Sequence, residues 1–118
     1  MKTKSNGDIL AAARQRMRDF VGDRDWEKFQ TPKNLSMALS VEASELLELF
    51  QWLSQAQSLA PGHEIKLKAS REIADIFIYL VRIADVLDVD IPTAVLEKLD
   101  MNEKKHPVGS PRPTPFEP

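Results

Sequence analysis

Glycine and proline are scarce over most of this chain, and this scarcity restricts its fold more than any other feature. The stretches 33–60 and 63–91 contain neither residue, whereas residues 106–118 contain five prolines. Because glycine and proline weaken or break helices, long helices can form wherever both are missing. The sequence therefore predicts long helices followed by a tail that is extended or disordered.

Apolar periodicity divides the region before the tail into four helices. We expect them over about residues 6–21, 32–53, 64–87 and 91–104. Gly22 is expected to end the first, Thr31 to cap the second ahead of Pro32, and Asp90 to cap the fourth. Residues 54–63 contain Pro61 and Gly62 and are expected to form a loop. The predicted fold is an all-α, four-helix bundle-like subunit, with one domain over residues 1–105 and a tail over residues 106–118.

Composition narrows the class of protein. The chain has no cysteine, which excludes disulfides and thiolate metal sites and suits the reducing cytoplasm. Its formal net charge of -2 leaves no basic excess for binding nucleic acid. No stretch approaches the roughly 18 apolar residues of a membrane span, and the polar start lacks the apolar core of a signal peptide. We therefore expect a cytoplasmic protein that binds neither nucleic acid nor membrane.

Two pairs of acidic residues border the apolar stripes of neighbouring helices. Glu42 and Glu45 lie in the second helix, and Glu72 and Asp75 lie in the third. Each pair is spaced i, i+3 and so projects from one side of its helix. Such pairs are common on solvated helices. Two pairs at the margins of the core leave a solvated face and a functional site about equally supported.

The functional alternative follows if the two helices pack antiparallel, because the four acids then converge at a half-buried seam. Like charges in such a place raise one another's pKa, and a divalent cation relieves the repulsion. Oxygen ligands favour Mg²⁺, or Mn²⁺ as a substitute, over zinc. Since Mg²⁺ also takes phosphate oxygens as ligands, this alternative predicts a polyphosphate substrate.

Two segments that contain these acids resemble the acidic motifs of MazG-like pyrophosphohydrolases. They are residues 41–52, VEASELLELFQW, and residues 71–80, REIADIFIYL. The family pattern is EExxE, a variable spacer and then ExxD. Three further segments are similar to the dCTP pyrophosphatase branch of the family: RDWEKFQTPKNL at 24–35, VDIP at 89–92 and KLDMNEKKHP at 98–107. The resemblance covers about residues 9–108.

The sequence departs from the family pattern at four positions. Val41 replaces the first acid of EExxE, but the metal site is expected to survive because Glu42 and Glu45 remain. Arg71 stands where glutamate is frequent. Gln30 and His106 stand where close relatives often have histidine and tyrosine, which bears on the choice of base rather than on the chemistry.

The resemblance implies a Mg²⁺-dependent nucleoside triphosphate pyrophosphohydrolase that attacks the α-phosphorus and releases the monophosphate and pyrophosphate. It further implies that dCTP-like substrates are favoured and that the activity cleans the nucleotide pool. The metal ligands and catalytic residues implied are Glu42, Glu45, Glu72 and Asp75.

Candidate substrate-binding residues surround these acids in the sequence. Trp26 and Trp52 can stack on a base, although both can equally be core residues. Lys98, Asn102 and Lys105 recur at i, i+4 and i+7 and form either a phosphate-facing row or a solvated charged face. The remaining candidates are Gln30, Asn34 and Tyr79, from the segment similar to the family's substrate side and from the two acidic helices.

The third predicted helix is apolar nearly all round. Its core stripe is expected to comprise Ala69, Ile76, Leu80, Ile83 and Leu87, with a second stripe of Leu67, Ala74, Ile78 and Val81 on the other side. A helix that is apolar on all sides needs burial on all sides, and a four-helix subunit cannot supply it. We therefore expect the second stripe to lie in the interface of a homodimer or tetramer, as the resemblance also implies.

Two alternative functions stay open at this point. The chain could be another all-α nucleotide hydrolase, dUTPase-like or similar to phosphoribosyl-ATP pyrophosphohydrolase, which would differ only in substrate. It could also be a non-catalytic helical interaction module whose proline-rich tail binds a partner.

Overall fold

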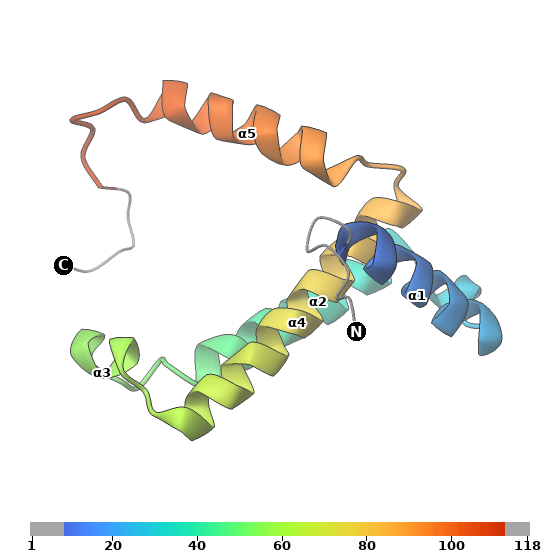
Figure 1. The fold of residues 1–118 in the computed structure, drawn as a ribbon, viewed down its shortest axis with the longest axis horizontal. Coiled ribbons are helices and arrows are strands. Elements are labelled where there is room, and N and C mark those ends of the chain that lie inside the picture. Colours follow the sequence, from blue (N-terminus) through green and yellow to red (C-terminus); the bar gives the residue numbers. More distant parts are fainter. Residues whose placement is uncertain (1–8, 113–118) are drawn as a thin grey trace, which may run out of the picture.

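The computed structural model describes residues 9–112, and in this range it contains five α-helices, one 3₁₀ helix and no strand (Figure 1). The elements are α1 (Ile9–Asp23), η2 (Glu27–Phe29), α2 (Pro32–Glu48), α3 (Gln55–Leu59), α4 (His63–Val86) and α5 (Ile91–Lys105). The all-α prediction is confirmed. The expected start of the first helix at residue 6 and the last six residues of the tail lie outside the described residues.

The most extensive packing is between α2 and α4, which lie side by side in opposite directions, and α1 packs against α4 (Figure 1). Both contacts place small or branched apolar side chains inside. The buried apolar residues of the described chain are Val21, Leu35, Ala69, Val81 and Ala84. Three of these belong to α4, so this helix is the centre of the subunit.

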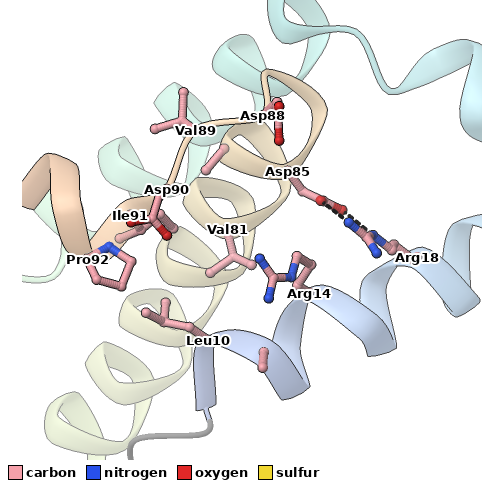
Figure 2. A pocket seen from close by; sticks show the side chains of 12 residues that line it. Leu10, Arg14, Arg18, Val81, Asp85, Asp88, Val89, Asp90, Ile91 and Pro92 are labelled. Carbon is pink, nitrogen blue, oxygen red and sulfur yellow. Dashed lines mark hydrogen bonds and ion pairs between the residues drawn. The ribbon is translucent and has the colours of Figure 1, made fainter.

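The burial of Val81 contradicts the predicted division of α4 into a core face and an interface face. This residue was expected in a subunit interface, but it is only 3% exposed within the single chain. Its side chain faces α1, where Leu10 and Arg14 lie opposite (Figure 2). Conversely, Leu80 and Leu87 were expected in the core but are 46% and 54% exposed. The expectation was wrong because α1 covers the side of α4 that carries Val81.

The helix ends also differ from expectation. Gly22 lies inside α1, which continues to Asp23, and the left-handed residue that follows the helix is Asp25 with φ 55°. Asp88 plays the same part after α4 with φ 56°. In both cases the next amide donates to a carbonyl five residues back, at 3.0 Å after α1 and 2.8 Å after α4. Aspartate is among the few residues other than glycine that tolerate this conformation, so it can end a helix.

A short helix interrupts the segment that was expected to be a loop. Helix α2 ends at Glu48 instead of about residue 53, and α3 begins after Ser54. The Ser54 hydroxyl accepts a hydrogen bond from the Gln57 amide at 3.1 Å, and the Gln57 side chain accepts one from the Ser54 amide at 2.9 Å. This reciprocal cap starts a new helix without any apolar periodicity, which is why periodicity did not predict α3.

An ion pair fastens α1 to the end of α4. Arg18 donates to both carboxylate oxygens of Asp85, at 2.7 Å and 2.5 Å (Figure 2). The hydrogen bond from Arg18 holds the pKa of Asp85 below its usual range, although partial burial acts in the opposite direction. The pair borders a cavity of about 230 Å³ between α1 and the connection from α4 to α5.

Helix α5 is the least packed of the described helices. Asp90 caps it as predicted, accepting a hydrogen bond from the Thr93 amide at 3.2 Å. No residue of α5 is buried, and the helix starts near the C-terminal end of α4 and lies apart from the α2–α4 pair (Figure 1). The radius of gyration is 17.4 Å, whereas a compact domain of this length has about 13.5 Å. None of the described helices is both long and apolar enough to span a membrane.

The cap of α2 gives the first testable prediction. The Thr31 hydroxyl accepts a hydrogen bond from the Asn34 amide at 3.2 Å. Thr31→Ala should lower the free energy of unfolding by about 1 kcal/mol, because that amide loses its partner. Urea unfolding measures the change. Thr31→Ser keeps the hydroxyl and is the control; equal stability of the alanine variant and the wild type would contradict the capping role.

Candidate metal centre

Three of the four predicted acids converge where α2 and α4 run antiparallel. Glu42, Glu45 and Glu72 each place one carboxylate oxygen within 4.8 Å of the others. The i, i+3 spacing puts the first two on one side of α2, and the antiparallel packing brings Glu72 of α4 opposite them. Asp75 lies on the same side of α4, one turn further on, but it is outside this group of three.

The acidic group is electrostatically strained. The pKa of Glu42 is raised, chiefly because Glu72 accepts a hydrogen bond from the protonated Glu42 carboxyl, and then because Glu42 is partly desolvated. The charges of Asp75 and Glu72 act in the same direction. The negative charge of Glu42 in turn raises the pKa of Glu45. The fold therefore holds negative charge together at a position where proton binding or cation binding relieves the repulsion.

Glu72 supplies an independent sign that the site fits a cation. Its Oε2 atom is buried and has no hydrogen-bond partner among the described residues. A buried carboxylate oxygen without a partner is costly, and a metal ion is one of the few groups that can satisfy it. Three carboxylate oxygens close together suit a hard divalent cation such as Mg²⁺ or Mn²⁺.

Two basic side chains beside the acids were not predicted as part of the site. Lys68 and Arg71 line an open depression of about 530 Å³ together with Glu45, Glu48, Leu49 and Glu72. Lys68 forms an exposed ion pair with Glu64 at 3.3 Å. Both could have been found from their spacing in the sequence, because Lys68 precedes Glu72 by one helical turn and Arg71 precedes it by one residue. They place positive charge beside the acids, where a phosphate group would need it.

The two tryptophans that were expected to stack on a base are not brought together within one chain. Trp26 lies at the start of η2, is 44% exposed, and packs edge-on against Phe20 with ring centroids 5.7 Å apart. Trp52 follows α2 in a turn and is 86% exposed, with no ring contact to any described residue. Neither is a core residue, so both faces of Trp52 are free to contact a ligand or another chain.

The candidate residues on the substrate side are held by local and long-range hydrogen bonds. Asn34 donates from Nδ2 to the Phe29 carbonyl at 3.1 Å and so closes the turn before α2. The Gln30 side chain accepts a hydrogen bond from Arg82 of α4 at 3.1 Å. Tyr79 is half-buried on α4, one turn beyond Asp75. These contacts fix the segment before α2 against the helix that carries Glu72.

The basic row of α5 is far from the acids of its own chain. Lys98, Asn102 and Lys105 are all exposed. Helix α5 lies apart from the α2–α4 pair that carries the three glutamates (Figure 1).

The fold and the acids together define a class: all-α proteins in which two antiparallel helices bring carboxylates of two acidic motifs to one point. Residues 37–112 match the model of the MazG-like family. The chain belongs to the MazG-like family, and the resemblance of its motifs is confirmed.

Similar proteins include dCTP pyrophosphatase 1 of Rattus norvegicus, 44% identical over 92 residues, which are 76% of this chain and 54% of that protein. The human dCTP pyrophosphatase 1 is 42% identical over 91 residues, which are 75% of this chain and 54% of that protein. This chain spans about half the length of these curated relatives. A crystal structure of a pyrophosphatase from Archaeoglobus fulgidus superposes with a TM-score of 0.73 at 35% identity, covering 91% of this chain and 97% of that one.

The strain in the acidic group predicts a stabilising substitution. The folded state binds the Glu42 proton more tightly than the unfolded state, so stability is lost as the pH rises through the raised pKa. Glu42→Gln removes this penalty. Without metal, at mildly alkaline pH, its midpoint of thermal unfolding should exceed that of the wild type, and the difference should vanish in acid, where the carboxyl is protonated in both states.

Differential scanning calorimetry in a chelating buffer measures this difference, and a repeat with Mg²⁺ should favour the wild type instead. Glu97→Gln, on the exposed side of α5, is the matched control and should change neither result. A lower midpoint for Glu42→Gln at alkaline pH would show that Glu42 is stabilising and would contradict the strain.

Proposed function

We propose that this protein is a Mg²⁺-dependent nucleoside triphosphate pyrophosphohydrolase that releases a monophosphate and pyrophosphate and accepts dCTP-like substrates. The observation that carries the proposal is the convergence of Glu42, Glu45 and Glu72, in which one buried oxygen of Glu72 has no hydrogen-bond partner within residues 9–112. The names of the similar proteins, dCTP pyrophosphatase and pyrophosphatase, support the reaction class. Cleaning of the nucleotide pool is the biological role that fits this reaction.

The acids have two roles in the proposed reaction, metal binding and activation of the attacking water. Glu42, Glu45 and Glu72 would hold Mg²⁺, and Asp75 remains the expected fourth ligand. When bound, the ion offsets phosphate charge and lowers the pKa of water. One of the glutamates is proposed to orient the attacking water and accept its proton. Lys68 and Arg71 lie where they could bind the departing pyrophosphate.

The substrate pocket is proposed to need a second copy of the chain. The exposed apolar residues of α5, Val95, Leu96 and Leu99, are 48%, 64% and 51% exposed and share one side of the helix. The row of Lys98, Asn102 and Lys105 flanks this side. Packing of this apolar side against a second subunit would bring the row toward the acids of that subunit. Packing of α5 on a second subunit would also explain why the radius of gyration of the single chain is large.

The assembly is proposed to be a dimer or a tetramer. Leu67, 43% exposed, and the exposed Ala74 remain candidates for the interface on α4, whereas Val81 does not. Trp52 would gain a partner in such an assembly and could then stack on a base, with Trp26 as the second candidate ring. Gln30, Asn34 and Tyr79 would contact the nucleoside. A non-catalytic interaction module is a poorer explanation, because it gives no reason to bury an oxygen of Glu72 beside two other acids.

The products of the reaction test the proposed activity. With dCTP and Mg²⁺ we expect dCMP and pyrophosphate, identified by anion-exchange chromatography. Glu45→Gln and Glu72→Gln should each reduce turnover by about two to three orders of magnitude while the helical circular dichroism is retained. Formation of dCDP and free phosphate would show cleavage at the γ-phosphate and would contradict the proposal. Near-normal turnover by both variants would remove the assigned metal site.

The assembly is tested on α5. Replacing Leu96 and Leu99 together by glutamate places charge on the apolar side of the helix, so the variant should sediment as a monomer and lose most of its activity. Met101→Glu makes the same kind of change on the opposite side of α5 and is the control. A wild-type chain that is a folded, active monomer at micromolar concentration would contradict the proposed assembly.

A further inference from the structure

Arg82 is the least exposed charged residue among those the structure describes, with 8% exposure, and the side chain of neighbouring Asp85 is as little exposed as its own. Burial of a guanidinium is unfavourable unless its donors are satisfied. Arg82 has two partners. Its Nη1 lies 3.5 Å from Asp85, and its Nε donates to Gln30 Oε1 at 3.1 Å. The buried charge therefore joins α4 to the segment that precedes α2.

The contact with Asp85 does not by itself explain the burial of Arg82. Both oxygens of Asp85 are bound more closely by Arg18, at 2.7 Å and 2.5 Å. Arg18 and Asp85 already fasten α1 to α4 without any help from Arg82. What Arg82 adds is a hydrogen bond to a residue 52 positions away in the sequence.

This hydrogen bond fixes the orientation of the Gln30 amide. Because Oε1 accepts from Arg82, the Nε2 amino group points away from the guanidinium, and a flipped amide would set two donors against each other. No residue of the described chain accepts a hydrogen bond from Nε2, and Gln30 is only half-buried. Gln30 therefore presents a hydrogen-bond donor, and not an acceptor, outside the protein interior.

Helix geometry relates Arg82, the partner of Gln30, to the acids. At about 100° per residue, Glu72, Tyr79 and Arg82 fall within about 80° of one another around α4. Arg82 is ten residues beyond Glu72, a rise of about 15 Å along the helix. On α2, Asn34 and Glu45 lie within about 20° of each other, so the same seam runs from the glutamates back to the start of that helix.

We propose that Arg82 is a positioning residue that holds the Gln30 amino group toward the nucleoside, where it donates to an acceptor of the base such as a carbonyl oxygen. This rests on the proposed function. With the triphosphate at the three glutamates, the nucleoside extends along the seam toward Gln30. Arg82 does not touch the substrate; it determines which group of Gln30 does.

Gln30→Glu keeps the acceptor for Arg82 but removes the proposed donor to the base. The glutamate still accepts from Arg82, now as an ion pair, so the midpoint of thermal unfolding should equal or exceed that of the wild type. The variant cannot donate, so KM for dCTP should rise about tenfold, the effect of one lost hydrogen bond, while kcat changes by less than about threefold. Gln57→Glu, in the cap of α3, is the matched control and should leave KM unchanged.

Arg82→Lys tests whether Arg82 acts through Gln30. In the wild-type background it should raise KM severalfold, because the amide can then rotate. In a Gln30→Ala background it should leave KM unchanged, because there is no amide left to position. A purely structural role of Arg82 predicts the same rise in KM in both backgrounds and would overturn the positioning role.

The outcomes separate this inference from the proposed function. Wild-type protein that hydrolyses dCTP, together with a stable Gln30→Glu variant of unchanged KM, would overturn this inference alone, whether or not the Arg82 variants fold. Wild-type protein that hydrolyses no nucleotide would overturn the proposed function and this inference with it. A rise in KM for dCTP that exceeds the rise for dATP would support contact with the base.

Discussion

Repulsion among Glu42, Glu45 and Glu72 is the constraint on which the rest of this structure depends. The antiparallel packing of α2 on α4 buries Leu35 and Ala69, and the same packing forces the three carboxylates together. A helix pair selected only for stability would separate these groups. The pKa of Glu42 is raised, chiefly by its hydrogen bond with Glu72 and also by desolvation and the nearby charges, so ionisation of Glu42 opposes folding. The hydrophobic contact thus maintains an arrangement that is unfavourable without a cation, which is typical of a metal site prepared before its ion arrives.

The convergence of Glu42, Glu45 and Glu72 could be predicted because its information is local, whereas the role of these acids as metal ligands stays a prediction. Acid pairs at i, i+3 beside an apolar stripe fix which side of a helix is charged, and only the antiparallel direction of the two helices had to be assumed. Gln30 was a candidate from resemblance, but its hydrogen bond with Arg82 spans 52 residues and has no signature in spacing. Lys68 and Arg71 were not predicted as site residues, and Arg71 was noted only as standing where the family frequently has glutamate.

The errors in the predicted fold have equally specific causes. Periodicity shows that α4 is apolar on two sides, but it does not show which side α1 covers, so Val81 was assigned to an interface although it is buried within the subunit. Glycine was taken as the helix terminator at residue 22, whereas the left-handed conformation fell on Asp25. The five residues of α3 depend on a reciprocal cap between Ser54 and Gln57, and a helix that short carries no periodic pattern. Tertiary packing and side-chain caps, which periodicity does not contain, decided each of these cases.

The connection between α4 and α5 has a consequence for assembly. Asp88 adopts its left-handed conformation and Asp90 caps α5 only two residues later, so local hydrogen bonds set the direction of α5 before it meets any other surface. Binding of a segment that is already helical and already oriented loses less conformational entropy than binding of a flexible arm. The direction of α5 is therefore set within the subunit. If the proposed assembly forms through α5, a longer or glycine-rich connection should weaken it without changing the residues in contact.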